Sequence, residues 1–226
     1  MLIDFHTHSL DVENENDLRF VVGKNSLGIH PWELTAPFEE NLYQKKFQQL
    51  KTQFHASILA IGECGLDRRR DGIAPIEMQA RVLEWHMDWA KEMNRPIIIH
   101  CVKAHSDLLK ILKDKKYKGK VLLHDYAGSL EEANKFLFYD CYFSFGHRLF
   151  TQARADVFKS LPVERLFLET DDQQKIKIKA LYEKAQALLN IDQKSFELMI
   201  EENLASFFSD LDNISTADVI NNLSSS

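Results

Sequence analysis

Cysteine is scarce in this 226-residue chain, and the three cysteines that occur show no paired spacing. Cys64, Cys101 and Cys141 are odd in number and belong to no CxxC or CxxxC motif. A disulfide scaffold needs an even set of cysteines, and a zinc ribbon needs closely spaced pairs. Both classes are therefore excluded, and reduced thiols fit the pattern best.

Long apolar runs and an excess of positive charge are missing as well. No apolar stretch approaches the ~18–20 residues of a membrane span, and Asp4, His6 and His8 interrupt the start, where a signal peptide would be apolar. Acidic residues outnumber basic ones by 34 to 28, a formal charge of −6. We therefore expect a cytoplasmic protein with no membrane association, no broad DNA-coating surface and no obligate protein partner.

The overall composition is that of a globular protein, with one unusual feature. Hydrophobic residues make up 45% and charged residues 27% of the chain, which excludes a disordered or collagen-like protein. The length suits one α/β barrel, so we predict a single domain over residues 1–211 and a C-terminal tail over 212–226, in which Thr216 can begin a last helix. The unusual feature is nine histidines.

Short β-rich runs alternate with amphipathic stretches along the chain. Most of the short runs are apolar on both faces, as strands of a parallel sheet covered by helices must be. This alternation predicts a TIM-type (β/α) barrel of seven or eight parallel strands. The predicted strands lie at 2–6, 57–63, 96–100, 120–124, 141–145 and 165–169, and the predicted helices at 37–54, 76–93, 103–116, 129–138, 150–160 and 175–190.

The second βα unit is expected to be irregular. Residues 19–23 and 26–30 both have the pattern of strands, but only Lys24 and Asn25 separate them. A parallel pair needs a crossover of roughly ten or more residues, so a helix is missing here. We predict a compressed, distorted second unit.

Histidines and carboxylates gather at the ends of the predicted strands. In a parallel barrel these ends form one rim, where barrel enzymes place their active sites. His6 and His8 are two apart on a strand and therefore share a face. The set exceeds four ligands and is dispersed along the chain, which favours a two-metal catalytic centre over a structural zinc site. The residues concerned are His6, His8, His30, Glu63, His100, His124 and Asp171.

The order of these motifs resembles the TatD family of metal-dependent deoxyribonucleases. The resemblance runs from about residue 2 to residue 208, and the GECGLD motif is its most specific element. The motifs that carry it are DFHTH at 4–8, GIHP at 28–31, GECGLD at 62–67, PIIIH at 96–100, HDYAG at 124–128, SF at 144–145, ETD at 169–171 and NLASFF at 203–208.

The resemblance implies two divalent metal ions: Mg, Mn or Zn. His6, His8 and Asp171 would hold the first ion, His100 and His124 the second, and Glu63 would bridge them. A water or hydroxide between the ions would attack phosphorus, and Asp171 would accept its proton. Glu63 and Asp171 are therefore the predicted catalytic residues, and the implied substrate is DNA or a small phosphodiester.

Further residues near the rim are predicted to contact the substrate. These are His30 and Asp67, Arg68 at the start of an arginine run, and His147 and Arg148 after the seventh strand. The alternatives also stay open: His30 as a turn residue before a proline, Asp67 as a loop or capping residue, and the arginine run as a solvated loop.

The chain also departs from the family pattern. Val102 stands where the family commonly has an arginine, and the region after Asp171 is short. These departures leave two alternatives open: a hydrolase of C–N or C–O bonds of the amidohydrolase type, and a metal-binding homologue without nuclease activity. Because amidohydrolase-type barrels often carry a carbamylated lysine where this chain has Glu63, the first alternative is the less favoured of the two.

Overall fold

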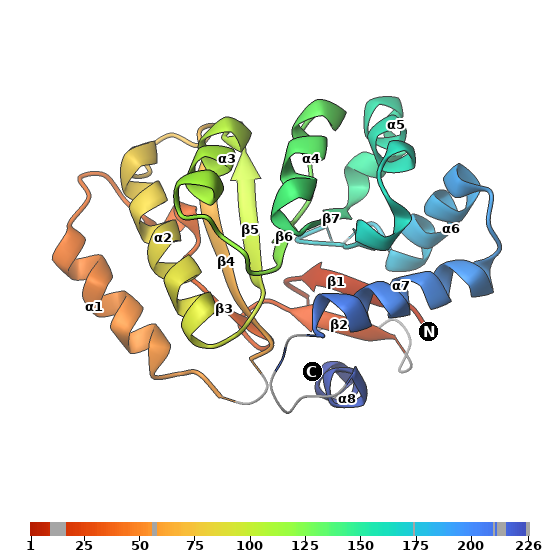
Figure 1. Ribbon diagram of the computed structural model, residues 1–226, viewed down its shortest axis with the longest axis horizontal. Coiled ribbons are helices and arrows are strands. Elements are labelled where there is room, and N and C mark those ends of the chain that lie inside the picture. Colours follow the sequence, from red (N-terminus) through yellow and green to blue (C-terminus); the bar gives the residue numbers. More distant parts are fainter. Residues whose placement is uncertain (10–16, 56–57, 174, 210, 212–215, 225–226) are drawn as a thin grey trace.

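The computed structural model describes residues 1–9, 17–55, 58–173, 175–209, 211 and 216–224 (Figure 1). Six parallel strands form one sheet in the order of the sequence, and two more form a parallel pair beside it. The pair is β1 (Ile3–Thr7) and β2 (Leu18–Val21); the sheet is β3 (Ser26–Leu27), β4 (Ala60–Asp67), β5 (Ile97–Val102), β6 (Val121–Leu123), β7 (Cys141–Phe145) and β8 (Leu166–Leu168).

The two sheets complete a ring through single backbone bridges. Thr7 pairs with Asp171 just beyond β8, and Val22 pairs with Ser26 between β2 and β3. The eight parallel strands of the described residues thus follow one another around a TIM-type barrel, although continuous strand pairing does not close it. The predicted compression of the second unit is confirmed, because a turn at residues 23–25 replaces the helix there.

Helices cover the outside of the strands, as the apolar runs required (Figure 1). Phe47 of α1 reaches across to α2, where it contacts the rings of Trp85, His86 and Trp89. The α-helices are α1 (Glu40–Lys51), α2 (Ile76–Glu92), α3 (His105–Asp114), α4 (Leu130–Phe136), α5 (Gln152–Ser160), α6 (Ile178–Leu189), α7 (Gln193–Phe207) and α8 (Thr216–Ser224), and the 3₁₀ helices are η1 (Pro31–Glu33), η2 (Leu137–Tyr139), η3 (His147–Phe150) and η4 (Val163–Arg165).

Two predicted strand boundaries were wrong, and both lie in segments that carry predicted site residues. We expected a strand at 57–63 to end at Glu63, but β4 continues to Asp67 because its residues 64–67 pair with β5. The start of that prediction, Ser57, lies outside the described residues. The strand expected at 26–30 stops at Leu27, since His30 instead caps the 3₁₀ helix η1 that Pro31 begins.

The N-terminal strand is anchored by an aromatic cluster. The Phe5 ring stacks on Phe167 of β8 at 3.9 Å between centroids and meets Phe207 of α7 edge-on at 5.3 Å. Since neighbouring side chains on a strand face opposite ways, burying Phe5 against α7 directs His6 to the other face. This packing fixes the register of the strand that carries the DFHTH motif.

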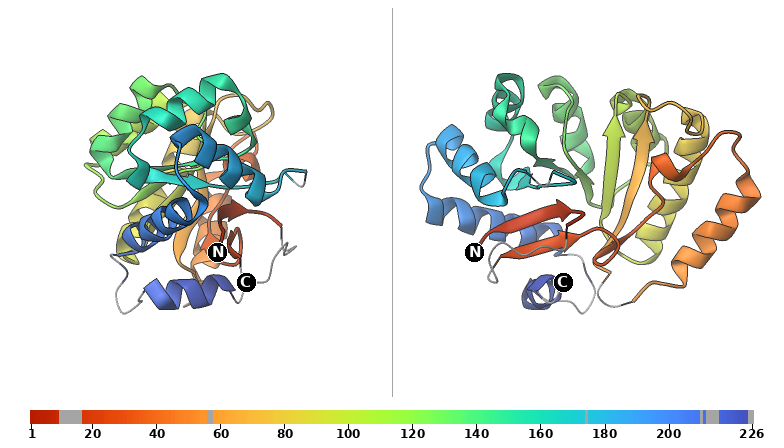
Figure 2. Two further views of the ribbon diagram at one scale, coloured as in Figure 1. Left: turned by 90° about the vertical axis from the view of Figure 1, so that its right-hand side faces the viewer. Right: turned by 180° about the vertical axis from the view of Figure 1, so that it is seen from behind.

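Helix α8 lies below β2 in all three views (Figures 1 and 2). It belongs to the predicted tail and buries Val219 and Leu223, each no more than 2% exposed. Among the described residues, no helix is both long and apolar enough to cross a membrane.

Candidate metal centre

Glu63 reaches the centre because β4 changes register within the GECGLD motif. The pairing of β4 with β5 shifts between Ile61 and Cys64. Gly62 has a φ of +129°, and a Cβ there would lie 2.4 Å from the carbonyl oxygen of Ile98. Only glycine fits such a position. The irregularity places a carboxylate in the middle of a barrel strand, facing the ends of its neighbours.

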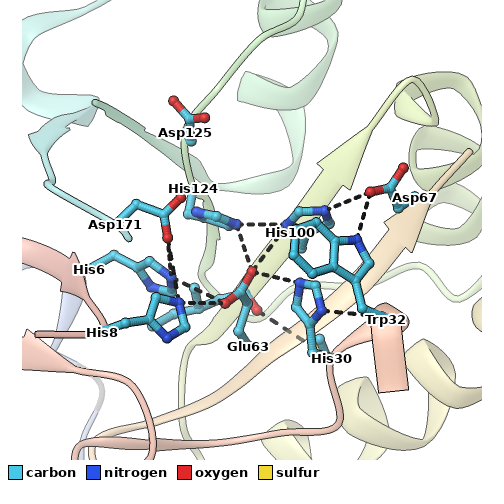
Figure 3. Close-up of polar contacts among 12 residues, drawn as sticks. His6, His8, His30, Trp32, Glu63, Asp67, His100, His124, Asp125 and Asp171 are labelled. Atoms are coloured by element: carbon cyan, nitrogen blue, oxygen red, sulfur yellow. Dashed lines mark hydrogen bonds and ion pairs between the residues drawn. The ribbon is translucent and has the colours of Figure 1, made fainter. Parts of the chain in front are cut away.

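The two oxygens of Glu63 face two different groups of side chains (Figure 3). Oε2 lies 3.3 Å from His6 Nε2 and 3.6 Å from His8 Nε2, and the Asp171 Oδ1 atom is 3.4 Å from the same His8 nitrogen. We call His6, His8 and Asp171 the β1 cluster. The three ligand atoms of His6, His8 and Glu63 all lie within 4.8 Å of one another, close enough to share one cation.

Oε1 of Glu63 faces three more imidazoles. It lies 2.8 Å from His124 Nε2, 3.1 Å from His100 Nδ1 and 3.1 Å from His30 Nε2. We call His30, His100 and His124 the β5 cluster. His30, Glu63 and His100 form a second candidate ligand group, and His6, His124 and Asp171 form a third that spans both clusters.

Backbone hydrogen bonds fix the β1 cluster from behind. The amide of Asp171 donates to the carbonyl of His6 at 2.9 Å, and the amide of His8 donates to the carbonyl of Asp171 at 3.1 Å. Asp4 adds a side-chain tie, because its carboxylate accepts from both the amide (2.9 Å) and the hydroxyl (2.6 Å) of Thr170. The first strand and the ETD motif are therefore held together although they lie 160 residues apart.

Side chains behind the β5 cluster orient its imidazoles. Nδ1 of His124 lies 3.2 Å from Oε1 of Glu169, and Ser144 donates to the other oxygen of that carboxylate. The arrangement leaves Nε2 of His124 for Glu63 or a cation, as second partners of ligand histidines usually do. The Glu169 side chain is fully buried, so its carboxylate is held in place next to His124.

The carboxylates of the centre remain ionised. Burial opposes ionisation of Glu63, but the charge of His124 and hydrogen bonds from His100, His124 and His30 hold its pKa well below the usual range. Burial likewise opposes ionisation of Asp171, and the hydrogen bond from His8 and the charges of His124 and His6 outweigh it, lowering the pKa to about 2. Two fixed negative charges surrounded by imidazole nitrogens form an environment suited to cations.

All of the predicted substrate residues except Arg68 lie near the centre. His30 touches Glu63, and Asp67 Oδ2 lies 3.4 Å from His100 Nε2. His147 and Arg148 line a small cavity of about 160 Å³ next to the centre, although Arg148 is ion-paired with Asp125. Arg68 instead makes a two-pronged ion pair with Asp107 of α3, at 2.8 Å for each contact.

A larger cavity of about 590 Å³ opens directly onto the centre. His8, Glu63 and Asp171 line it together with His30, His100 and His124, so both clusters face the same space. On its far side it reaches Leu50 and Gln53 at the end of α1. The rim of the barrel therefore offers a substrate-sized recess beside the candidate ligands.

Two residues around these cavities were not predicted from the sequence. Trp32 lines both cavities, and Asp125 pairs with Arg148 at the smaller one, which Arg69 of the arginine run also lines. Trp32 directly follows the GIHP motif and Asp125 directly follows His124, so adjacency to motif residues was the available signal. That signal gives no direction for a side chain, which is why these residues were not singled out.

Two other histidines are structural. His86 is fully buried in α2, where its Nε2 accepts a hydrogen bond from the Ile29 amide at 2.9 Å and its Nδ1 lies 2.7 Å from the Val82 carbonyl. His105 is 8% exposed and faces Glu132, with its Nδ1 at 3.4 Å. Neither side chain belongs to a candidate ligand group among the described residues.

Comparison with known proteins agrees with this geometry. The model of a family described as TatD related DNase matches residues 3–209, nearly the whole chain. The chain belongs to the TatD family. The resemblance inferred from the motifs is confirmed, and the match covers every residue of both clusters.

Similar proteins are named as metal-dependent hydrolases or deoxyribonucleases. The chain is 32% identical over 169 residues to YabD of Bacillus subtilis, named an uncharacterized metal-dependent hydrolase, covering 73% of this chain and 63% of YabD. It is 28% identical over 158 residues to the deoxyribonuclease Tat-D of Schizosaccharomyces pombe, covering 65% of this chain and 50% of Tat-D. The chain thus spans between half and two thirds of the length of these relatives.

Solved structures of the TatD family share the fold. The TatD homologue YjjV of Escherichia coli superposes with a TM-score of 0.71 at 22% identity, covering 87% of this chain and 78% of YjjV. A TatD family hydrolase from Entamoeba histolytica gives 0.70 at 21% identity, covering 85% of this chain and 74% of that one. At these identities the likeness supports the barrel and nothing further about the substrate.

Proposed function

We propose that this TatD family chain is a metal-dependent phosphodiesterase that hydrolyses phosphodiester bonds of DNA. The observation that carries the proposal is the position of Glu63, whose two oxygens face two separate clusters of nitrogen and oxygen ligands. A carboxylate shared in this way suits a pair of divalent cations. Paired cations are suited to phosphoester hydrolysis, because they stabilise both the attacking and the leaving oxygen.

The residues present fit divalent cations. Both ring nitrogens of His6 are buried, and neither has a hydrogen-bond partner among the described residues, a costly arrangement for an imidazole. A cation at Nε2, which faces Glu63 and Asp171, would remove part of that cost. A mixed set of imidazole and carboxylate ligands suits Zn or Mn, while Mg favours the oxygen atoms.

One cation would be held by His6, His8 and Asp171, and the other by His100 and His124. Glu63 would bind both cations. When bound, the cations would supply Lewis-acid activation of water and neutralise charge on the phosphate. Asp171 is ionised and opens onto the cavity, so its carboxylate can accept the proton that water loses. Glu169 keeps His124 in the tautomer that presents Nε2, and His30 adds a third imidazole on the Oε1 side of Glu63.

Substrate contacts are proposed for the residues around the two cavities. His147 and Arg148 line the smaller cavity and offer donors for phosphate oxygens next to the centre. Asp67 acts indirectly, through its contact with His100. The deoxyribonuclease name of the Schizosaccharomyces pombe relative supports DNA as the substrate over other phosphodiesters.

The test is metal analysis of the purified chain, followed by assays with DNA and with a small phosphodiester. The wild type is expected to bind divalent metal and to hydrolyse both substrates with Mn or Mg. Asp171→Asn is expected to lose hydrolysis, and Asp114→Asn, the same change at the exposed end of α3, to keep it. Full activity in Glu63→Ala would contradict the proposal. Turnover of lactones or amides alone would favour the amidohydrolase alternative, and bound metal without any turnover would favour a non-catalytic homologue.

A further inference from the structure

Trp32 is an exposed aromatic side chain directly beside the candidate metal centre. It is 39% exposed, whereas Trp89 in the helical layer is 2% exposed. It lines both the 590 Å³ cavity and the 160 Å³ cavity, and its ring centroid lies 5.7 Å from that of His100. An indole is the largest apolar side chain, so leaving it open at the mouth of a polar site needs a reason.

The indole is held in one orientation (Figure 3). Its Nε1 donates a hydrogen bond to Asp67 Oδ2 at 2.8 Å, and its ring stands at 89° to that of His30, with centroids 4.8 Å apart. The backbone beneath it is fixed as well, because Pro31 begins η1 and His30 with Glu33 forms a capping box around it. A ring fixed in this way offers a flat surface at little cost in conformational entropy.

A guanidinium group lies over the indole. The Cζ atom of Arg70 is 4.2 Å from the centre of the Trp32 ring. Such a pair is mildly favourable and exposed, so it can open to admit another flat group between the two or exchange with it. Planar groups that stack on both indole and guanidinium are the bases of nucleic acids.

We propose that Trp32 and Arg70 form a stacking platform for the nucleobase next to the scissile phosphate. This inference rests on the proposed phosphodiesterase function and adds a subsite to it, which takes the face of an unpaired base. Stacking uses the face of the base and leaves its pairing edge unread, so the platform accepts all four bases. The arginine lies in the run that the sequence singled out, but two residues beyond Arg68.

The first test measures stacking without catalysis. A tetranucleotide of thymidine and an abasic strand of the same length are titrated into the chain in the presence of a chelator, and tryptophan fluorescence is recorded. The chain has three tryptophans. A saturable fluorescence loss is expected with the thymidine strand in the wild type and in Trp85→Phe, but not in Trp32→Phe and not with the abasic strand. An equal loss with both strands, a loss that persists in Trp32→Phe, or no loss in the wild type would overturn the proposal.

The second test compares kcat/KM for the two strands with Mn present. The wild type is expected to prefer the strand that carries bases by about tenfold, Trp32→Ala to lose that preference, and Trp32→Phe to keep most of it. Equal preference in wild type and Trp32→Ala would show that Trp32 only covers the contact between Asp67 and His100. If the wild type cleaves neither strand, the phosphodiesterase function fails, and the fluorescence result still decides whether Trp32 stacks on a base.

Discussion

The β1 cluster and the β5 cluster face the same carboxylate from surroundings that differ. In the β1 cluster, the side chains of His8 and Asp171 are 46% and 24% exposed. In the β5 cluster, those of His100 and His124 are 10% and 4% exposed. Glu169 and Asp67 contact the imidazoles of the β5 cluster directly, whereas the β1 cluster is held by backbone hydrogen bonds and by the contact of Asp4 with Thr170.

This difference indicates that the two clusters have different roles. A buried, braced set of imidazoles fixes the position of a cation, because its ligands have few alternative rotamers and oriented tautomers. A half-open set with a carboxylate facing the cavity can exchange water and meet the substrate. We therefore expect the β5 cluster to bind its ion more tightly and the β1 cluster to supply the group that accepts a proton.

The largest effect is expected where the clusters meet. Glu63→Gln removes the shared negative charge, so metal binding at both clusters falls and hydrolysis drops on the order of 10³-fold or more. Metal content and kcat/KM measure this loss. Glu77→Gln, a matched change at an exposed position of α2, should alter neither quantity. If Glu63→Gln lost only one of two bound ions, Glu63 would belong to a single cluster.

A smaller effect is expected from loosening the β5 cluster alone. Glu169→Gln weakens the acceptor that orients His124, and metal affinity or activity should fall by about 10- to 100-fold. Titration with metal should show the loss at one of the two ions, with the other unchanged. An equal loss of affinity for both ions would mean that the clusters do not act separately.

A third prediction concerns His86, the buried histidine of α2, which belongs to neither cluster. Burial lowers the pKa of His86 from 6.5 to about 4, so below pH 6.5 the unfolded chain binds a proton that the folded chain refuses. The contribution of His86 to the free energy of unfolding is therefore fully present above pH 6.5 and is lost as the pH falls toward 4. It decreases by about 2 kcal/mol between pH 7.5 and 5. In urea unfolding, the difference in stability between the wild type and His86→Gln should change with pH by this amount, because the other titrating groups are the same in both proteins. The same pH dependence in both would contradict the assignment.

The smallest effect is expected at the edge of the smaller cavity. Arg148→Ala removes a cation next to the centre and should raise KM for a phosphodiester by up to about fivefold, since the arginine is partly exposed and already paired with Asp125. Arg68→Ala is the matched control, because that arginine pairs with Asp107 away from both cavities. A larger effect from Arg68→Ala than from Arg148→Ala would restore the predicted role of Arg68.

Local sequence patterns predicted the barrel and the gathering of histidines and carboxylates at one of its rims. Apolar runs mark buried parallel strands, and His6, His100 and His124 stand at or near the ends of such runs. The position of Glu63 was predicted at a strand end and lies within β4, since a change of register cannot be read from apolar pattern alone.

Side-chain directions on loops were the part that sequence could not give. Arg68, Arg69 and Arg70 are adjacent and identical in type, yet they face Asp107, the smaller cavity and Trp32 respectively. Each direction depends on partners that only the folded chain brings near. The alternative role of His30 as a turn residue and its contact with Glu63 turned out to be compatible, because it caps η1 through Nδ1 and faces Glu63 through Nε2.

Glu63 is proposed to join two metal sites. A crystal structure of the chain soaked with Mn tests this proposal directly. Anomalous scattering distinguishes a bound Mn ion from water and protein atoms. We expect two peaks roughly 3.5–4 Å apart, one on each side of the Glu63 carboxylate. A single peak, or peaks away from His6, His8, Glu63, His100, His124 and Asp171, would contradict it.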